Sequence, residues 1–253
     1  MLSYASDKEE DLLNRKNFIR ASGLAVTALV TGTWKALDPE RAMGAEPLAS
    51  AVSCVLTPEQ TEGPYYIARE KVRRNIREKR PGIPLLLKLN VVDAATCEPI
   101  KKAAVDIWHC DAGGIYSGFQ AASVGGAPGS SGPTDKATFL RGIQLTNGHG
   151  LAQFQTMYPG WYRGRTVHIH VKVHLASDPV GHVVHTGQLY FQDTLTSRVY
   201  QRSPYKGRAA SRDTFNRTDG IFQQGGAQSM LTVHPDKKGG YVATITLGVR
   251  RAA

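Results

Sequence analysis

Nine residues in the second half of the chain alternate between apolar and polar side chains: Val167-His168-Ile169-His170-Val171-Lys172-Val173-His174-Leu175. Successive side chains of a β-strand point to opposite faces, so the alternation predicts a strand with an apolar face directed at a core. His168 and His170 then share the other face, about 6–7 Å apart at their Cα atoms. Two imidazoles at that separation can bind one metal ion, but the same pattern also fits a strand whose solvent face carries histidines.

Short runs of β-forming residues, separated by Gly, Pro and Asn, occur on both sides of this segment and predict a mainly β fold. These candidate strands are residues 85–92, 104–110, 138–145, 152–157, 187–191, 231–234 and 241–248. With residues 167–175 they suffice for a two-sheet β-sandwich with long loops. Asn147-Gly148 is typical of tight hairpin turns, so the strands on either side of it are predicted to pair.

Two polar segments between the candidate strands are expected to lie on the surface. Residues 120–136 are rich in Gly and Pro and are predicted to form a loop. Residues 196–226 are expected to wrap the sandwich with a short helix at most. Both segments are candidates for shaping a binding pocket.

The composition excludes some classes of protein. Of the 253 residues, 41% are apolar and 21% are charged, and no apolar run reaches the ~18 residues needed to span a bilayer. A stable membrane span is therefore not expected. The 31 basic and 21 acidic residues give a net charge of +10, which suits nucleic acid, an acidic polymer or a small anionic substrate. No nucleic-acid motif is present and the charge is dispersed, so nucleic acid is not predicted as a partner.

The first 50 residues differ from the rest of the chain. A charged opening precedes a short apolar stretch at 21–33, which is typical of a signal region. The junction at 14–20 resembles a twin-arginine export signal with Lys16 in place of the second arginine. We therefore expect residues 1–50 to be an export signal and linker, residues 51–253 to be the β-sandwich domain, and the protein to be periplasmic or secreted. The alternative is a cytoplasmic protein whose N-terminus is an amphipathic helix.

The three cysteines are Cys54, Cys97 and Cys110, and their odd number leaves at least one unpaired within the chain. In an exported protein any two of them are candidates for a disulfide. The sequence does not select the pair. His109 and Cys110 lack the spacing of a structural zinc site.

Two Gly-containing turns carry tyrosines close to the candidate strands. Residues 158–165 place two tyrosines and two arginines just before the histidine-bearing strand, and residues 108–118 place Tyr116 after another strand. These and three further segments, in this order, resemble the intradiol ring-cleavage dioxygenases, a family that includes catechol and protocatechuate dioxygenases. The five segments are Thr61-Glu62-Gly63-Pro64-Tyr65-Tyr66, Trp108 to Gly118, Pro159-Gly160-Trp161-Tyr162, Arg165-Thr166-Val167-His168-Ile169-His170 and Gly187-Gln188-Leu189-Tyr190-Phe191.

The resemblance implies a non-haem ferric ion held by two tyrosinates and two histidines, which at the matching positions are Tyr116, Tyr162, His168 and His170. The residue types suit this ion, because phenolate is a hard anionic ligand that favours Fe(III) over Fe(II). Two other interpretations remain open. One is a zinc or copper site on His168, His170 and His174, and the other is a secreted, non-enzymatic β-sandwich that binds an acidic polymer.

The resemblance also implies the reaction. A catechol-type diol and O2 would react so that both oxygen atoms enter the product, a cis,cis-muconate-type diacid. Tyr162 would accept a substrate proton, Arg165 would stabilise negative charge on the substrate, and Gln188 would help to orient it. Which catechol is the substrate, and whether the chain forms a homo-oligomer, are not determined by the sequence.

Three aromatic or imidazole side chains close to these positions have less defined expectations. Tyr65 and Tyr66 are expected either to line the pocket mouth or simply to pack. His174 shares the face of His168 and His170 but matches no ligand of the family, and we expect it to be structural or solvent-facing.

Overall fold

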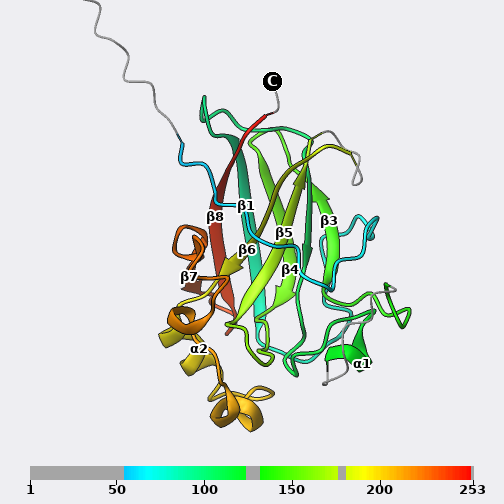
Figure 1. Cartoon of the computed structure of the whole chain (residues 1–253), viewed down its shortest axis with the longest axis vertical. Coiled ribbons are helices and arrows are strands. Elements are labelled where there is room, and N and C mark those ends of the chain that lie inside the picture. Colours follow the sequence, from blue (N-terminus) through cyan, green and yellow to red (C-terminus); the bar gives the residue numbers. More distant parts are fainter. Residues whose placement is uncertain (1–53, 124–131, 176–180, 252–253) are drawn as a thin grey trace, which may run out of the picture. The chain divides into compact units, whose positions relative to one another are not determined.

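Strands dominate the computed structural model, which describes residues 54–123, 132–175 and 181–251. They are β1 (Pro84–Asp93), β2 (Ala104–Trp108), β3 (Arg141–Leu145), β4 (Leu151–Met157), β5 (His168–His174), β6 (Val183–Tyr190), β7 (Thr232–Pro235) and β8 (Tyr241–Val249) (Figure 1). The helical elements are α1 (Gln120–Ser123), α2 (Asp193–Val199) and 3₁₀ turns at Lys206–Ser211, Asn216–Thr218 and Gly226–Ser229. The predicted mainly β fold is confirmed.

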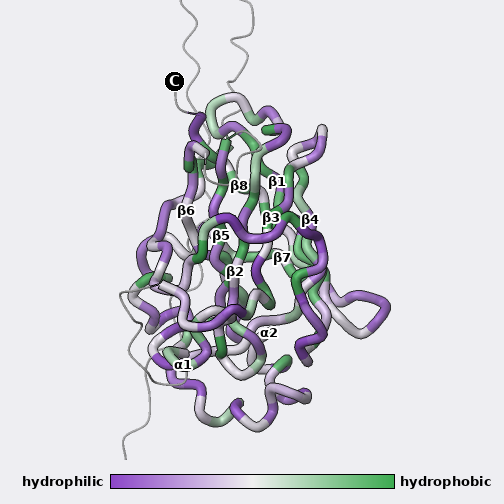
Figure 2. The backbone as a smooth tube through the Cα atoms, turned by 90° about the vertical axis from the view of Figure 1, so that its right-hand side faces the viewer, coloured by the Kyte–Doolittle hydropathy of each residue, from purple (hydrophilic) through white to green (hydrophobic). Residues whose placement is uncertain are grey.

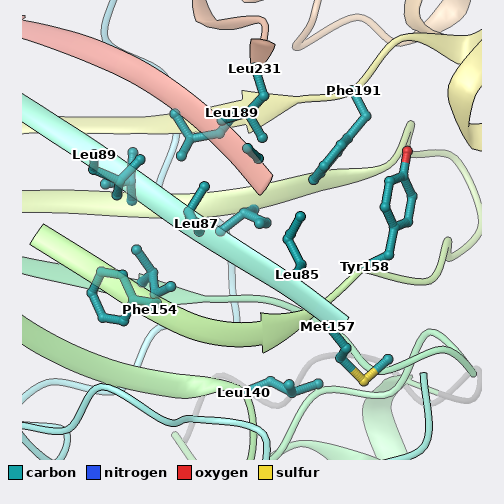
Figure 3. Close-up of a cluster of buried hydrophobic side chains, with 14 of the residues drawn as sticks. Leu85, Leu87, Leu89, Leu140, Phe154, Met157, Tyr158, Leu189, Phe191 and Leu231 are labelled. Atoms are coloured by element: carbon teal, nitrogen blue, oxygen red, sulfur yellow. The ribbon is translucent and has the colours of Figure 1, made fainter. Parts of the chain in front are cut away.

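The strands form two four-stranded sheets, in the orders β4-β1-β8-β7 and β3-β2-β5-β6. Neighbouring strands are antiparallel except for the parallel pair of β1 and β8. Leu85, Leu87 and Leu89 of β1 are at most 1% exposed and belong to the same apolar cluster as Leu189 of β6, toward which they extend in Figure 3. The two sheets therefore enclose one core, as predicted for a β-sandwich.

Both faces of β5 are buried. Its apolar residues Ile169, Val171 and Val173 lie in the core, as the alternation predicts. The polar side chains of its other face, from His168 to His174, are each at most 8% exposed. The N-terminal part of the described chain helps to cover the sheet that contains β5. In this segment, Gln60 N–H donates to Thr186 O of β6 and Arg73 N–H donates to Ile143 O of β3. In Figure 2 the hydrophobic stretches lie mostly along the strands, and the connecting loops are largely hydrophilic.

The hairpin predicted around Asn147-Gly148 is wrong, because β3 and β4 belong to different sheets. The side chain of Asn147 accepts hydrogen bonds from the N–H groups of His149 (2.9 Å) and Leu151 (3.0 Å). This turn carries the chain from one sheet to the other, where β4 pairs with β1. Both strands still bury apolar residues in the shared core. The alternation of apolar and polar residues would be the same if they paired in one sheet, so neither it nor the turn dipeptide shows that they lie in different sheets.

The polar segment 196–226 contains the end of α2 and short 3₁₀ turns, in agreement with its prediction. Only the ends of the predicted loop at 120–136 are described, and its start forms α1. The proposed export signal at 1–50 lies outside the described residues. No helix in the described ranges has the length and apolar character needed to cross a bilayer.

Cys54 and Cys97 form a disulfide, whereas Cys110 is a buried free thiol. Cys97 lies in the connection between β1 and β2. Cys54 lies three residues before Thr57, whose N–H donates to Gly248 O near the end of β8 (2.9 Å). The disulfide thus fixes the start of the described chain to the sandwich. The sequence left this pairing open.

Candidate functional site

The polar face of β5 meets polar and aromatic side chains of its two neighbouring strands. In the antiparallel register, His170 lies opposite Trp108 of β2 on one side and opposite Gln188 of β6 on the other, and His168 lies opposite Tyr190. The rings of Trp108 and His170 stack, with centroids 4.9 Å apart and an angle of 5° between their planes. The pairing of β5 with β2 and β6 therefore sets the position of the histidines and of Gln188.

Three of the four predicted ligands converge. His168 Nε2 is 3.1 Å from His170 Nε2 and 3.2 Å from Tyr162 Oη. The other ring nitrogen of His168 is 2.6 Å from the carbonyl oxygen of Thr166, and we assign a proton to that nitrogen because a carbonyl only accepts. Nε2 of His168 is then a lone-pair donor directed at the other two side chains.

Tyr116, the fourth predicted ligand, packs against the same group. Its ring centroid is 5.5 Å from that of Tyr162 and 6.1 Å from that of His170. The residue is 1% exposed, and its hydroxyl is a buried polar atom without a hydrogen-bond partner in the described part of the chain. A buried hydroxyl of this kind is uncommon unless an ion or water completes its coordination.

Burial keeps all four side chains uncharged when no metal is bound. It lowers the pKa values of His168 and His170 well below the ordinary value of histidine, and the nearby Arg165 lowers them further. Burial also raises the pKa values of Tyr116 and Tyr162 above that of free tyrosine, although Arg165 opposes this at Tyr162. The imidazoles are therefore ready to bind a cation, while the phenols need a strongly charged metal ion to release their protons.

These donors fit a ferric ion. Two neutral imidazole nitrogens are borderline ligands, while a phenol within 3.2 Å of one of them and a buried phenol without a hydrogen-bond partner become hard anionic ligands once deprotonated, a combination that suits Fe(III). The zinc or copper alternative is not supported, because no group of three or more His, Cys, Asp or Glu side chains within the described residues is arranged to hold a metal ion. His174 is buried rather than solvent-facing.

Arg165 is held beside this group by an ion pair with a buried carboxylate. Its Nε donates to Asp219 Oδ2 (2.9 Å), its Nη2 to Gln188 Oε1 (2.5 Å), and its Nη1 lies 3.5 Å from Tyr162 Oη. The side chain of Asp219 is 0% exposed, against 14% for that of Arg165. Gln188 also donates to the carbonyl oxygen of Thr61 (3.0 Å). The guanidinium is thus fixed within reach of Tyr162.

The segment at 61–66 covers the histidines. Gly63 adopts a φ of +73°, and a Cβ atom there would lie 3.2 Å from Cε1 of His170, so a larger residue would be both strained and crowded. Tyr65 stacks on Tyr116 with ring centroids 4.6 Å apart and also lines a cavity beside Tyr162. Tyr66 instead packs on Trp108, 4.8 Å between centroids. Tyr65 therefore lines a cavity as well as packing against Tyr116.

The sequence did not single out Asp219 as part of this site. The residue lies in a polar segment without periodicity, 54 residues after Arg165, and no local pattern indicates which side chain it meets. No local pattern marks Thr166 as the residue whose carbonyl oxygen binds His168; its only signal in the sequence is its place two residues before that histidine.

The chain is similar in sequence and fold to known dioxygenases. Residues 61–196 match the family model described as Dioxygenase. An intradiol ring-cleavage dioxygenase from Tetranychus urticae is 39% identical, with a TM-score of 0.71 over 78% of this chain and 95% of that one. The dioxygenase domain of a carbohydrate-binding fusion protein from a cellulolytic Streptomyces is 29% identical, with a TM-score of 0.55 over 78% of this chain and 100% of that one.

A more distant structure shares the fold. The 3-chlorocatechol 1,2-dioxygenase of Rhodococcus opacus is 18% identical, with a TM-score of 0.54 over 80% of this chain and 76% of that one. A comparison with curated proteins gave no match. Given the family model and the extent of the similarity to the Tetranychus enzyme, the chain belongs to the intradiol ring-cleavage dioxygenases, a family of ring-cleaving oxidoreductases.

Proposed function

We propose that this protein cleaves a catechol-type aromatic diol between its two hydroxyl-bearing carbons, with both atoms of O2 entering a cis,cis-muconate-type diacid. Non-haem Fe(III) would be held by Tyr116, Tyr162, His168 and His170. The observation that carries the proposal is the convergence of Tyr162 Oη and the Nε2 atoms of both histidines beside the unpartnered hydroxyl of Tyr116. The chemistry supplied by ferric iron at this position is Lewis-acid activation of a chelating diol toward O2.

The surrounding residues have separate roles in this proposal. Tyr162 accepts a proton from a substrate hydroxyl at Oη, and the Arg165 guanidinium 3.5 Å away favours the phenolate form. Arg165 also stabilises the negative charge that develops on the diol during the reaction. Gln188 is hydrogen-bonded to Arg165 and to the carbonyl oxygen of Thr61, and it orients the substrate beside the guanidinium. Gly63 lies over His170, and Tyr65 stacks on Tyr116, so both help to hold the predicted ligands in place.

The test is reconstitution with ferric iron, followed by measurement of O2 uptake and of the ultraviolet spectrum of the product from catechol. We expect one O2 consumed per ring cleaved and a broad visible absorption band from tyrosinate bound to Fe(III). Tyr162→Phe is expected to abolish O2 uptake and to change the visible band. A colourless protein with stoichiometric zinc would contradict the proposal. So would a protein that binds an acidic polymer equally well with and without Tyr162 and cleaves no diol.

We also propose that the protein is exported to the periplasm or the medium. The Cys54–Cys97 disulfide supports this, because structural disulfides persist mainly in oxidising compartments. Cell fractionation of the natural host, with detection of the processed N-terminus, tests the proposal. Full-length protein confined to the cytoplasm would contradict it.

A further inference from the structure

Arg141, the first residue of β3, is a buried cation to which the proposed reaction assigns no role. Its side chain is only 1% exposed. In the register of the sheet, Arg141 lies opposite Trp108 of β2, and Trp108 lies opposite His170 of β5. Directly opposite residues of paired strands share a face, so the guanidinium lies on the same face of the sheet as the predicted ligand His170.

The guanidinium of Arg141 binds the residue that follows Tyr116. Its Nε donates to the carbonyl oxygen (3.1 Å) and the hydroxyl oxygen (2.9 Å) of Ser117, and its Nη2 donates to the same carbonyl oxygen (2.7 Å). The hydroxyl of Ser117 in turn donates to the carbonyl oxygen of Phe139 (2.6 Å). Two N–H groups of a rigid planar cation on one carbonyl oxygen fix the position and the direction of that peptide group.

Tyr116 itself is held through its main chain and its ring. Its N–H donates to the hydroxyl oxygen of Ser123 (3.0 Å), and its ring centroid lies 6.0 Å from the Cζ atom of Arg141. Its own hydroxyl, as described above, has no hydrogen-bond partner in the described ranges. The orientation of this predicted ligand therefore depends on the bonds to its turn rather than on a bond to its phenol oxygen.

Arg141 is in turn fixed by its neighbours. Its carbonyl oxygen accepts from Nε (3.1 Å) and Nη2 (2.8 Å) of Arg73, and its Nε lies 3.9 Å from Oε1 of Glu70, whose side chain is 5% exposed. Burial lowers the pKa of Arg141 to about 10, so the side chain stays charged at neutral pH. A donor that is both charged and immobile makes a strong bond to a carbonyl oxygen.

We infer that Arg141 is a positioning residue for Tyr116: it holds the Ser117 carbonyl so that the tyrosine ring stays against Tyr162 and His170. The inference rests on the proposed function for the identity of the metal ion. Strand pairing fixes His168 and His170, whereas Tyr116 lies in a turn and needs support from a rigid element. Arg141 supplies that support from the first residue of β3.

The first test measures the affinity of the full chain for Fe(III), by competition with nitrilotriacetate, and the position of the visible tyrosinate band. Arg141→Met is expected to raise the Kd for iron by about tenfold to a hundredfold, as for other residues that orient a metal ligand, and to shift the band. Arg141→Lys should recover part of the loss. An ammonium group can reach the Ser117 carbonyl oxygen but cannot make two parallel bonds to it.

A double-mutant cycle shows whether Arg141 acts through Tyr116. Tyr116→Phe alone should weaken iron binding, because it removes a ligand. Adding Arg141→Met to Tyr116→Phe should then raise the Kd by no more than about threefold further, since the side chain that Arg141 positions no longer binds the metal. A merely structural role would make the two losses multiply and would leave the band of Arg141→Met unchanged. Either result would overturn the inference.

Two further variants separate positioning from folding. Arg141→Met combined with Glu70→Gln leaves no uncompensated charge from this pair in the interior, and it should lose the same iron affinity as Arg141→Met alone. Arg77→Lys is the matched control for Arg141→Lys. The Arg77 guanidinium also binds two carbonyl oxygens, those of Arg80 and Gly82 (2.8 Å each), in a turn that carries no predicted ligand. An equal loss of iron affinity in Arg77→Lys and Arg141→Lys would contradict the inference.

Hydrogen exchange of the metal-free protein tests the placement of the turn without iron or turnover. The N–H groups of Tyr116 and Gly118 both donate to side chains, and in Arg141→Met they should exchange about tenfold faster while those of β5 keep their rates. Unchanged exchange at both positions would overturn the inference. If Arg141→Met loosens the turn in this way but the wild type cleaves no diol, the proposed function is wrong and the role of Arg141 stands.

Discussion

Asp219 determines where the Arg165 guanidinium can lie. Its Oδ2 accepts hydrogen bonds from Arg165 Nε (2.9 Å) and from the backbone N–H of Thr166 (2.8 Å), while Oδ1 accepts from the N–H groups of Ile221 (2.8 Å) and Phe222 (3.0 Å). All four donors require an acceptor, so an amide cannot replace the carboxylate without placing its NH₂ group against two of them. The carboxylate therefore connects a polar loop to Thr166, two residues before the start of β5.

Asp219→Asn is expected to lower kcat for diol cleavage by about tenfold or more and to reduce the free energy of unfolding by about 2–4 kcal/mol, because it leaves Arg165 without its buried counter-ion. Steady-state kinetics and urea unfolding measure the two effects. The matched control is Asp213→Asn in the same segment, because Asp213 is exposed and, among the residues that the structure describes, accepts only from Gly164 N–H (3.2 Å) and the Thr214 hydroxyl. If the control impairs kcat as much as Asp219→Asn, the assigned role of Asp219 is wrong.

Asp106 is a buried acid on β2, opposite Lys172 of β5. Burial is the main cause of a pKa raised to about 8, against about 4 in the unfolded chain; the hydrogen bond with Tyr66 opposes this rise, and the nearby Glu70 adds to it. Between these pH values the folded state binds more protons than the unfolded state, so the free energy of unfolding falls as pH rises from about 4 to about 8.

The expected contribution of Asp106 is a loss of at most about 1.4 kcal/mol per pH unit within that range. Asp106→Asn removes the titration while keeping the shape of the side chain. Urea unfolding at several pH values from 5 to 8 should therefore show the variant gaining stability relative to the wild type as pH rises. If the free energies of unfolding of the two proteins changed in parallel with pH, the predicted shift in the pKa of Asp106 would be wrong.

At the scale of elements, the two tyrosine-bearing turns are packed directly against each other. Gly160 N–H donates to the carbonyl oxygen of Asp111 (3.0 Å), which joins the turn of Tyr162 to the turn of Tyr116. A Cβ atom at Gly160 would lie 2.3 Å from the carbonyl oxygen of Asp111 and 2.7 Å from that of Ala112. Because both obstacles are backbone atoms, neither can move aside without shifting a whole turn.

Gly160→Ala is therefore expected to separate the two turns, to lower the free energy of unfolding by about 2–3 kcal/mol and to reduce iron binding. Thermal unfolding and the intensity of the visible band per protein chain measure these effects. Gly148→Ala is the matched control, since a Cβ atom there meets nothing within 4 Å and should change neither quantity. Full iron loading of a stable Gly160→Ala protein would contradict the coupling of the turns.

The contrast between β5 and the turn at Asn147 shows what the sequence could predict at this scale. The alternation in β5 determines which side chains face the core, because a strand has only two faces. It also places His168 and His170 on one face, and the structure brings them together with Tyr162. The Asn147-Gly148 dipeptide specifies a turn but not which sheet the next strand joins, since that depends on contacts made by distant segments. The contact between Asp219 and Arg165 is of the same long-range kind.

At the scale of the whole molecule, the disulfide and the candidate site are linked to different ends of the strands. Cys97 lies just after the C-terminal end of β1, and Cys54 is near the residues that bond to the end of β8. The turn that carries Tyr162 follows β4, whose end at Met157 pairs with Pro84 at the opposite, N-terminal end of β1. The length of β1 therefore separates the disulfide from the proposed chemistry.

This separation predicts that removing the disulfide affects stability and leaves catalysis intact. The bond joins residues 43 positions apart, and the chain-entropy model gives about 4 kcal/mol for a loop of that length, so the double variant Cys54→Ser with Cys97→Ser should unfold with a free energy lower by about 2–4 kcal/mol. Its kcat and visible band at 25 °C should equal those of the wild type. The wild type treated with a reductant provides the control, because it loses the same bond without a substitution. A double variant that keeps full stability but loses its iron would contradict this prediction. It would show that the disulfide at one end of β1 affects iron binding at the other end.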